Sequence, residues 1–192
     1  MAMALEQALS HPGELVAVWD WGAREERLLV CSVVDGKLGI MASVEMTQAE
    51  REAMAATLRA RGVRQGATAG VCPFTWSNDG AFTVWSLTDT VVTSSGDTLR
   101  IAGGARIRKA DAARVWTFLD DSLGHRGVRV VTLSGAPILI AEEEDAAAQL
   151  DPTYGMDNVA IDAAWATFLG RDLASWLGVP IVDEMVSSPT TI

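Results

Sequence analysis

Apolar and polar residues alternate along three successive stretches near the start of the chain, and this alternation predicts three strands. The stretches cover residues 14–21, 27–34 and 38–44. Asp35 and Gly36 separate the second stretch from the third, and both residues tolerate the positive φ that a type I′ hairpin turn requires. We therefore expect a three-stranded antiparallel unit that places Trp19 and Trp21 on one face of its first strand.

A helix-capping signal follows these strands. Thr47 and Glu50 have the spacing of a capping box, in which each side chain bonds the backbone amide of the other residue. The helix that begins there places Met54 and Leu58 on one face, and Gly62 supplies the left-handed residue at which many helices end. Residues 1–66 are thus expected to form a βββα unit, which either stands alone or extends the sheet that follows.

Strand-like stretches return in the second half of the chain, joined by turns that contain glycine. They cover residues 81–87, 90–95, 98–102, 128–133 and 137–141. Residues 109–119 fit two interpretations. Propensity favours a helix there, whereas the alternation of Val115 and Thr117 with Trp116 and Phe118 favours a crossover followed by a strand.

The clearest element is an amphipathic helix near the C-terminus. Its apolar residues recur at intervals that are typical of one buried stripe: Ile161, Trp165, Phe168, Leu169, Leu173 and Trp176. We expect Asp157 or Asn158 to cap this helix and Gly178 and Pro180 to end it. It would span about 20 residues and about 30 Å.

These elements resemble a bacterial pleckstrin-homology-like (PH-like) domain over residues 71–178. The resemblance lies in the segments SLTDTVVTSSGDTLRI and KADAARVW and in the helix that carries Trp165 and Trp176. It implies an α+β fold, in which a curved, mostly antiparallel sheet is closed by the long C-terminal helix, and it includes no catalytic signature. The expected organisation is the βββα unit at 1–66, a PH-like domain at 67–186 and a frayed tail at 187–192.

Composition is that of an ordinary globular protein, with 49% hydrophobic and 21% charged residues among 192. No stretch reaches the roughly 18 apolar residues of a membrane span, and the first residues lack the basic segment of a secretory signal. Cys31 and Cys72 lack the spacing of a zinc site or a redox pair. We expect a cytoplasmic protein with reduced thiols and with no cofactor or metal.

The formal charge of −10 is concentrated toward the C-terminus, because residues 134–192 hold 10 acidic residues and 1 basic one. This balance argues against nucleic acid as a partner. The acidic residues do not fit the ligand spacing of an EF-hand loop. We expect the densest run to be solvated, and we interpret it as a candidate acidic partner surface, with a divalent-cation site as the alternative: Glu142, Glu143, Glu144 and Asp145.

Cations gather in the middle of the chain, where 7 of the 15 Lys and Arg residues lie within residues 100–129. The densest group is a candidate surface for a partner or an anion: Arg100, Arg106, Arg108, Lys109 and Arg114. In a PH-like fold this group would face an anionic headgroup, since arginine offers bidentate geometry to oxyanions. The alternative is that these residues pair with the acidic third of the chain.

Catalytic motifs are absent from the sequence, which contains no nucleophile elbow, metalloprotease helix or phosphate-binding loop. Asp120 and Asp121 beside His125 form the arrangement that best suits acid–base chemistry. The leading hypothesis is a non-enzymatic module that binds a protein or peptide partner. A carboxylate-dependent enzyme, with or without a metal, and an anionic lipid-headgroup binder are the alternatives, and the seven tryptophans also suit a homodimer face.

Overall fold

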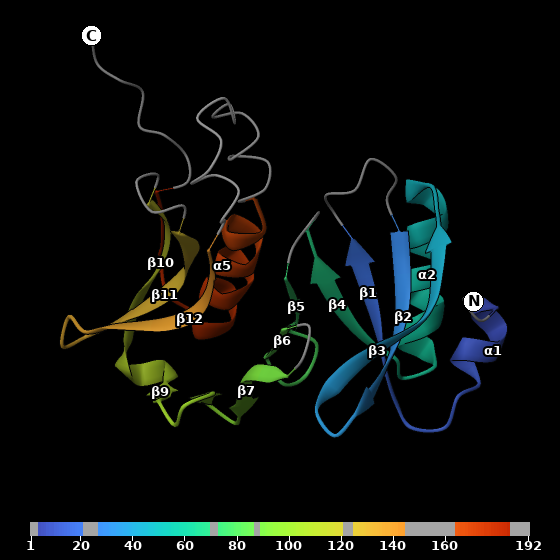
Figure 1. The fold of residues 1–192 in the computed structure, drawn as a ribbon, viewed down its shortest axis with the longest axis horizontal. Helices are drawn as coiled ribbons and strands as arrows, with labels where there is room; N and C mark the ends of the chain where they lie inside the picture. Colours follow the sequence, from blue (N-terminus) through green and yellow to red (C-terminus); the bar gives the residue numbers. More distant parts are fainter. Residues whose placement is uncertain are drawn as a thin grey trace, which may run out of the picture. The chain divides into compact units, whose positions relative to one another are not determined.

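The computed structural model describes residues 4–20, 27–69, 73–86, 89–120, 125–144 and 164–184. The chain divides into two compact units, which we call unit 1 (residues 1–93) and unit 2 (residues 94–192). The described strands form a nine-stranded sheet in the order β3-β2-β1-β4-β5-β6-β7-β8-β9 and a four-stranded sheet in the order β12-β11-β10-β13 (Figure 1). The division at residues 93 and 94 lies within β7, whereas the expected division at residue 66 lies inside β4.

Unit 1 begins with a short helix and the three strands that the sequence predicts. Its elements are α1 (Leu5–Leu9), β1 (Glu14–Asp20), β2 (Arg27–Val34), β3 (Lys37–Glu45), α2 (Gln48–Ala60), β4 (Arg64–Thr68), β5 (Phe74–Ser77), β6 (Thr83–Ser86) and β7 (Thr90–Ser95).

Two local predictions in unit 1 are confirmed. Asp35 and Gly36 have φ values of 50° and 77°, as a type I′ turn requires. The capping box of α2 is present in both directions, with the Thr47 hydroxyl accepting from the Glu50 amide and the Glu50 carboxylate accepting from the Thr47 amide.

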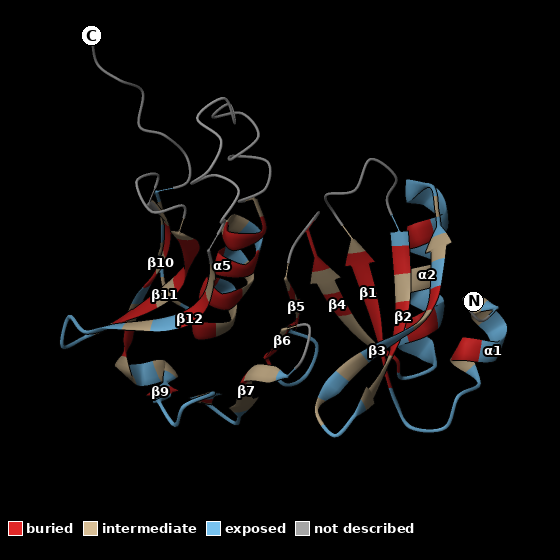
Figure 2. Ribbon diagram, viewed as in Figure 1, coloured by how far each residue is buried: buried red, intermediate tan, exposed pale blue. Residues whose placement is uncertain are grey.

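Strand β1 is buried on both faces, which Figure 2 shows as a red strand. One face, with Leu15 and Trp19, packs against Leu58 of α2. The other face, with Val16 and Val18, belongs to a cluster that also contains Trp85 of β6. Because β6 lies three places from β1 in the sheet order, the sheet must curl for Trp85 to reach that face.

The start of β7 contacts the β2–β3 turn, so two distant parts of the curled sheet meet there. The Thr90 hydroxyl, at the start of β7, donates to the carbonyl of Gly36 at 2.5 Å. The Lys37 ammonium lies 3.8 Å from the Asp89 carboxylate at the same place. The contact joins β7 to the turn and not to an edge strand, so the described sheet curves back on itself without closing into a barrel.

Unit 2 contains the end of the nine-stranded sheet and the whole four-stranded sheet. Its elements are β8 (Thr98–Ile101), β9 (Arg106–Arg108), the 3₁₀ turn η1 (Lys109–Asp111), β10 (Ala112–Asp120), β11 (His125–Thr132), β12 (Pro137–Glu144), α5 (Ala164–Leu177) and β13 (Ile181–Asp183). Of the two interpretations of residues 109–119, the crossover followed by a strand is therefore the right one.

Helix α5 packs closely on one face of the four-stranded sheet. The contact forms at Gly170, where an added Cβ would lie 2.5 Å from Thr117 Cγ2 of β10 and 3.2 Å from Ile181 Cδ1 of β13. Trp165, Leu169 and Leu173 are fully buried beside it. A glycine at this position lets the helix backbone approach the strands more closely than any other residue would allow.

The predicted fold class is wrong in three respects. The described chain is mostly strand, in two sheets, and not a PH-like α+β arrangement. The curl that brings Trp85 onto β1 lies in unit 1, and the four-stranded sheet in the second half is covered by α5 without being closed. The C-terminal helix has 14 described residues, and Phe168, expected in its buried stripe, is 40% exposed. Ile161 and the expected caps lie outside the described residues.

Candidate functional site

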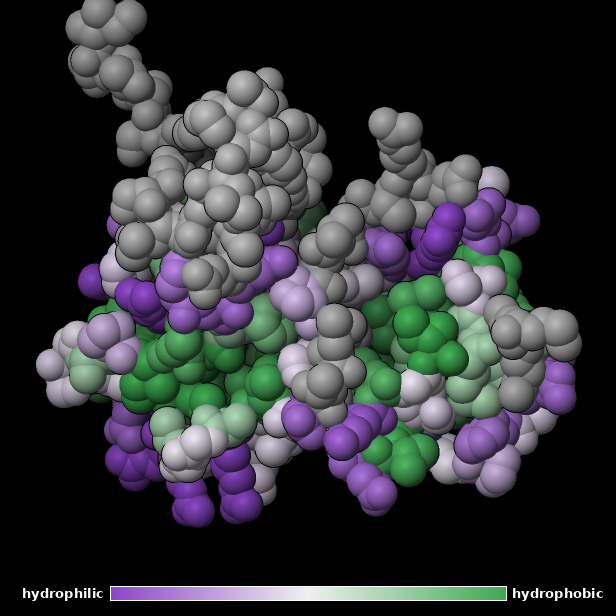
Figure 3. All heavy atoms as spheres, viewed as in Figure 1, coloured by the Kyte–Doolittle hydropathy of each residue, from purple (hydrophilic) through white to green (hydrophobic). Residues whose placement is uncertain are grey.

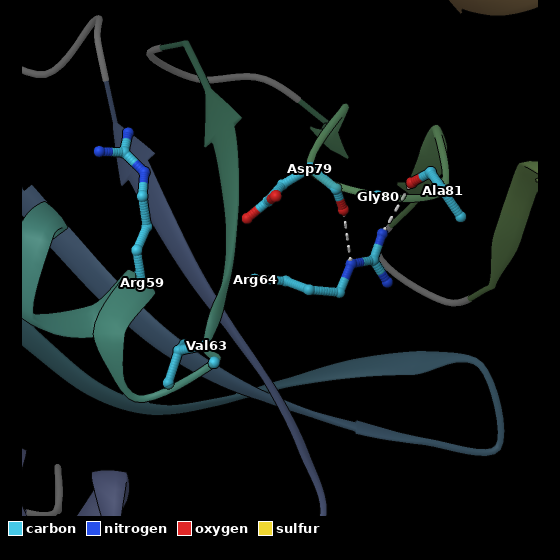
Figure 4. Close-up of a pocket in the computed structure, with 7 residues that line it drawn as sticks. Arg59, Val63, Arg64, Asp79, Gly80 and Ala81 are labelled. Carbon is cyan, nitrogen blue, oxygen red and sulfur yellow. Dashed lines mark hydrogen bonds between the residues drawn. The ribbon is translucent and has the colours of Figure 1, made fainter.

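A cavity of about 460 Å³ opens in unit 1 where α2 ends and the β5–β6 loop approaches β4. Its walls comprise Arg59, Gly62, Val63, Arg64, Asp79, Gly80 and Ala81. Figure 4 shows the Arg64 guanidinium beside Asp79 and Ala81, whereas the Arg59 side chain extends away from it. A second cavity of about 400 Å³ shares Gly62, Val63 and Arg64 with the first.

The donors of Arg64 are committed within the protein. Its Nε donates to the Asp79 carbonyl at 3.3 Å and one terminal nitrogen donates to the Glu14 carboxylate at 2.7 Å. The other terminal nitrogen donates to the Ala81 carbonyl at 2.9 Å and to Thr83 Oγ1 at 3.1 Å. Arg64 therefore holds the β5–β6 loop in place, and its guanidinium has little capacity left for a ligand.

The remaining charges at this cavity have both signs. Asp79 contributes a carboxylate, one oxygen of which accepts the Gln65 amide at 3.0 Å, and Arg59 contributes an exposed guanidinium. A pocket with balanced charges and a structural arginine in its wall selects neither anions nor cations. We interpret both cavities as the surface of a structural junction.

Two of the five predicted cations of unit 2, Arg108 and Lys109, contact another side chain in the structure. Arg108 forms a two-point contact with Asp111, with distances of 2.7 Å from Nε and 3.0 Å from a terminal nitrogen. This carboxylate raises the pKa of Arg108, and the guanidinium lowers the pKa of Asp111. The Lys109 ammonium lies 4.0 Å from the centre of the Trp176 ring, a cation–π distance.

The other three cations have no ion-pair or cation–π partner among the described residues. Arg100 and Arg106 are exposed and lie directly opposite each other on β8 and β9. Arg114 is exposed on β10, away from that hairpin in sequence. The structure thus brings Arg100, Arg106 and Arg108 onto one side of the β8–β9 hairpin.

The acidic run is less solvated than its sequence suggests. Strand β12 continues to Glu144, so Glu142 and Glu143 are strand residues. The Glu143 carboxylate accepts from Arg126 Nε at 2.9 Å and from the Trp165 indole at 3.0 Å. The expectation of a solvated run is therefore wrong for Glu143, whose side chain is partly buried in an internal ion pair. Asp145 lies outside the described residues.

A histidine–carboxylate pair lies at the same end of the sheet. His125 Nδ1 is 3.1 Å from a carboxylate oxygen of Glu142, which lies diagonally across from it, since the cross-strand partner of Glu142 is Gly127. Such a pair orients an imidazole, as general bases require. Asp121, which the sequence placed beside His125, lies outside the described residues. Among the described residues, no three His, Cys, Asp or Glu side chains are grouped as metal ligands would be.

A row of four side chains crosses the face of the four-stranded sheet that points away from α5. Val182 of β13 lies opposite Trp116 of β10, Trp116 opposite Arg129 of β11, and Arg129 opposite Leu139 of β12. We call these four residues the cross-sheet row. Its two ends are the most accessible, since Val182 is 42% and Leu139 41% exposed.

Arg129 joins the row to a second aromatic ring. Its guanidinium lies 3.9 Å from the centre of the Phe118 ring and 5.6 Å from that of Trp116. Phe118 itself covers Gly127, whose added Cβ would lie 3.0 Å from Phe118 Cζ. The Trp116 indole nitrogen is shielded from solvent and has no acceptor in the described chain. This face therefore presents aromatic rings and a stacked guanidinium, while the unpaired indole N–H lies beneath its surface.

Sequence reasoning missed the cross-sheet row. The alternation of Val115 and Thr117 with Trp116 and Phe118 indicates that both aromatic residues lie on the same face of β10. This alternation was the only feature of the sequence that pointed to the row. The partners of Trp116 follow only from the strand register, which shifts at a bulge between Val128 and Arg129.

Comparisons with family models, with curated protein sequences and with solved structures returned no match to this chain. In the described part of the chain, no helix has the length and apolar character needed to cross a bilayer.

Proposed function

We propose that this chain is a non-enzymatic binding module and that a protein or peptide partner docks on the cross-sheet row in unit 2. The observation that carries the proposal is the row itself: Trp116 and Arg129 at its centre, with partly exposed Leu139 and Val182 at its ends. Trp and Arg are the residue types most enriched where protein interfaces gain their binding energy. The proposal assumes the cytoplasmic location expected from the sequence.

The chemistry of the row suits a polypeptide in particular. Leu139 and Val182, the apolar ends of the row, would pack against apolar side chains of a bound peptide. The aromatic rings and the Arg129 guanidinium between them would contact the peptide's central part. Figure 3 shows hydrophobic atoms, in green, over the region in which Figure 1 draws β11 and β12.

A displayed library of 12-residue peptides tests the proposal. Peptides are selected on the full-length protein, with counter-selection on Trp116→Ala, and the selected sequences are then synthesised and measured by fluorescence anisotropy. We expect Trp116→Ala and Arg129→Ala to weaken binding at least tenfold, because each removes a central contact. Leu133→Ser is the matched control, since Leu133 is an exposed apolar residue of the β11–β12 turn outside the row.

The proposal fails if no selected peptide distinguishes Trp116→Ala from the parent while circular dichroism shows both proteins folded. Light scattering at two protein concentrations tests whether the protein forms a homodimer. If the parent dimerises and Leu139→Asp does not, the partner on this face is a second copy of the chain.

The alternative function, a carboxylate-dependent enzyme, is supported by the pair of His125 and Glu142. It predicts an activity that His125→Ala and Glu142→Gln both abolish and that Trp116→Ala leaves intact.

A further inference from the structure

The β8–β9 hairpin of unit 2 has one apolar side and one basic side. Leu99 and Ile107 are opposite each other and buried, at 0% and 2% exposure. The next pair along the hairpin is Arg100 and Arg106, and its neighbour on the same side pairs Thr98 with Arg108. Because directly opposed residues share a face, three arginines project from the basic side.

Arg100 and Arg106 are unusual because they are like charges in directly opposed positions. Such pairs have Cβ atoms about 5 Å apart and destabilise the strands that carry them. Both side chains are exposed, and neither contacts an acidic group in the described chain. The hairpin therefore holds two guanidinium groups close together, and the described residues supply no counter-charge to either.

Arg108 shows what satisfies an arginine on this side. Asp111 places both carboxylate oxygens on the Arg108 guanidinium, at 2.7 and 3.0 Å. This is the bidentate geometry in which guanidinium and carboxylate groups match best. Arg100 and Arg106 are also exposed and lie on the same side, but the described chain gives them no such carboxylate.

The tip of the hairpin leaves these two arginines accessible. The turn reads Ala102-Gly103-Gly104-Ala105, and both glycines have positive φ, at 91° and 99°. A Cβ added to either glycine would meet no atom within 4 Å, so the space around the tip is open. Residues 94–114 carry five cationic and two acidic residues, in a chain whose formal charge is −10.

We propose that Arg100 and Arg106 together bind the side-chain carboxylates of an acidic peptide segment on a partner protein. The Arg108–Asp111 contact shows that a carboxylate fits an arginine on this side of the hairpin. The basic side carries Thr98 and the arginines and no large apolar residue that would enter a membrane, which favours a peptide over a lipid surface. The proposal uses a different surface from the cross-sheet row and does not depend on it.

Fluorescein-labelled octaglutamate is the probe, and its anisotropy is measured with full-length protein at 20 and 150 mM NaCl. We expect saturable binding at 20 mM that weakens at least tenfold in Arg100→Gln/Arg106→Gln and severalfold in Arg100→Lys/Arg106→Lys, because lysine keeps the charge but loses the bidentate contact. Arg59→Gln is the control, since Arg59 is an exposed arginine of unit 1. Trp116→Ala should bind octaglutamate as the parent does, which separates this proposal from the previous one.

A second readout checks that the double variant is folded and that the arginines repel each other. The urea midpoint of Arg100→Gln/Arg106→Gln should equal or slightly exceed that of the parent, because the substitution removes like-charge repulsion. Equal octaglutamate binding by the parent and the double variant, or no saturable binding at 20 mM NaCl, overturns the proposal. The proposal is also overturned if inorganic phosphate or anionic vesicles bind and octaglutamate does not. That result would indicate a phosphate or membrane site instead.

Discussion

Strand β1 of unit 1 and strand β10 of unit 2 both alternate large side chains on two faces, yet the two strands are covered differently. Both faces of β1 are buried, one under α2 and the other under Trp85 of the curled sheet. In contrast, α5 covers one face of β10, and the other face carries a row with accessible ends. The difference shows that a strand with large apolar residues on both faces is not always buried on both. Each face is buried only where a helix packs on it or where the sheet curls over it.

The same substitution in the two regions tests this comparison most strongly. Leu28 is fully buried against β1 in unit 1, whereas Leu139 is an accessible end of the cross-sheet row. Leu28→Ala should cost about 2–5 kcal/mol of unfolding free energy, and Leu139→Ala less than about 1 kcal/mol. Urea unfolding monitored by hydrogen exchange of β1 and β10 peptides would measure both. Equal losses would contradict the difference in cover.

A smaller loss is expected where α5 meets its sheet. Gly170→Ala places a methyl group 2.5 Å from Thr117 Cγ2, and the helix or the strand must move to accept it. We expect a loss of about 1–3 kcal/mol, measured by the same unfolding experiment. Ser175→Ala, on the exposed side of α5, is the control and should change stability by less than about 0.5 kcal/mol. If both variants change the free energy of unfolding equally, close packing of the helix on the strands does not explain why position 170 is a glycine.

A third prediction concerns the ion pair beneath α5. Glu143→Gln removes the charge that Arg126 contacts at 2.9 Å, and the Arg126 side chain is only 4% exposed. Because glutamine keeps one acceptor oxygen, the expected loss is about 1–2 kcal/mol, at the low end for a hydrogen bond to a charged group. Glu184→Gln, at an exposed glutamate after β13, should leave the urea midpoint unchanged. A neutral result for both variants would mean that Arg126 is stabilised mainly by its other contacts.

A fourth prediction is a pH dependence from the thiol buried in unit 1, which appears only at alkaline pH. Burial raises the pKa of Cys31 from 9.0 to about 11. The folded state then holds the thiol proton more tightly than the unfolded state, so this contribution to stability is present below pH 9 and is lost as pH rises toward 11. Urea midpoints of Cys72→Ser and Cys31→Ala/Cys72→Ser across pH 8–11 would show the extra decline only in the first. Parallel declines would contradict the raised pKa.

Predictions from sequence succeeded where the determining contacts are local. The Asp35-Gly36 turn and the capping box of Thr47 and Glu50 depend on residues within four positions of one another, and both form as expected. The acidic run was misjudged because the partner of Glu143 is Arg126, on a strand 17 residues earlier. Nothing near Glu143 in sequence reveals a buried cation, so a charged run was taken for a solvated one.

The cross-sheet row and the curled sheet depend on information that no single segment contains. The row requires the register of four strands, including a bulge between Val128 and Arg129. The curl requires Trp85 to return to a strand that precedes it by more than 60 residues. The amphipathic pattern of α5 did predict a helix, but the side on which Phe168 lies depends on how Gly170 packs against β10.

The contacts of Arg64 have a consequence for the order in which unit 1 assembles. Its guanidinium joins Glu14, 50 residues earlier, to the carbonyls of Asp79 and Ala81. The bonds to the β5–β6 loop join residues close in sequence, whereas the bond to Glu14 forms only when β4 aligns beside β1. During refolding, the full set of Arg64 contacts should therefore be complete only with the β1–β4 pairing, a step limited by long-range chain closure.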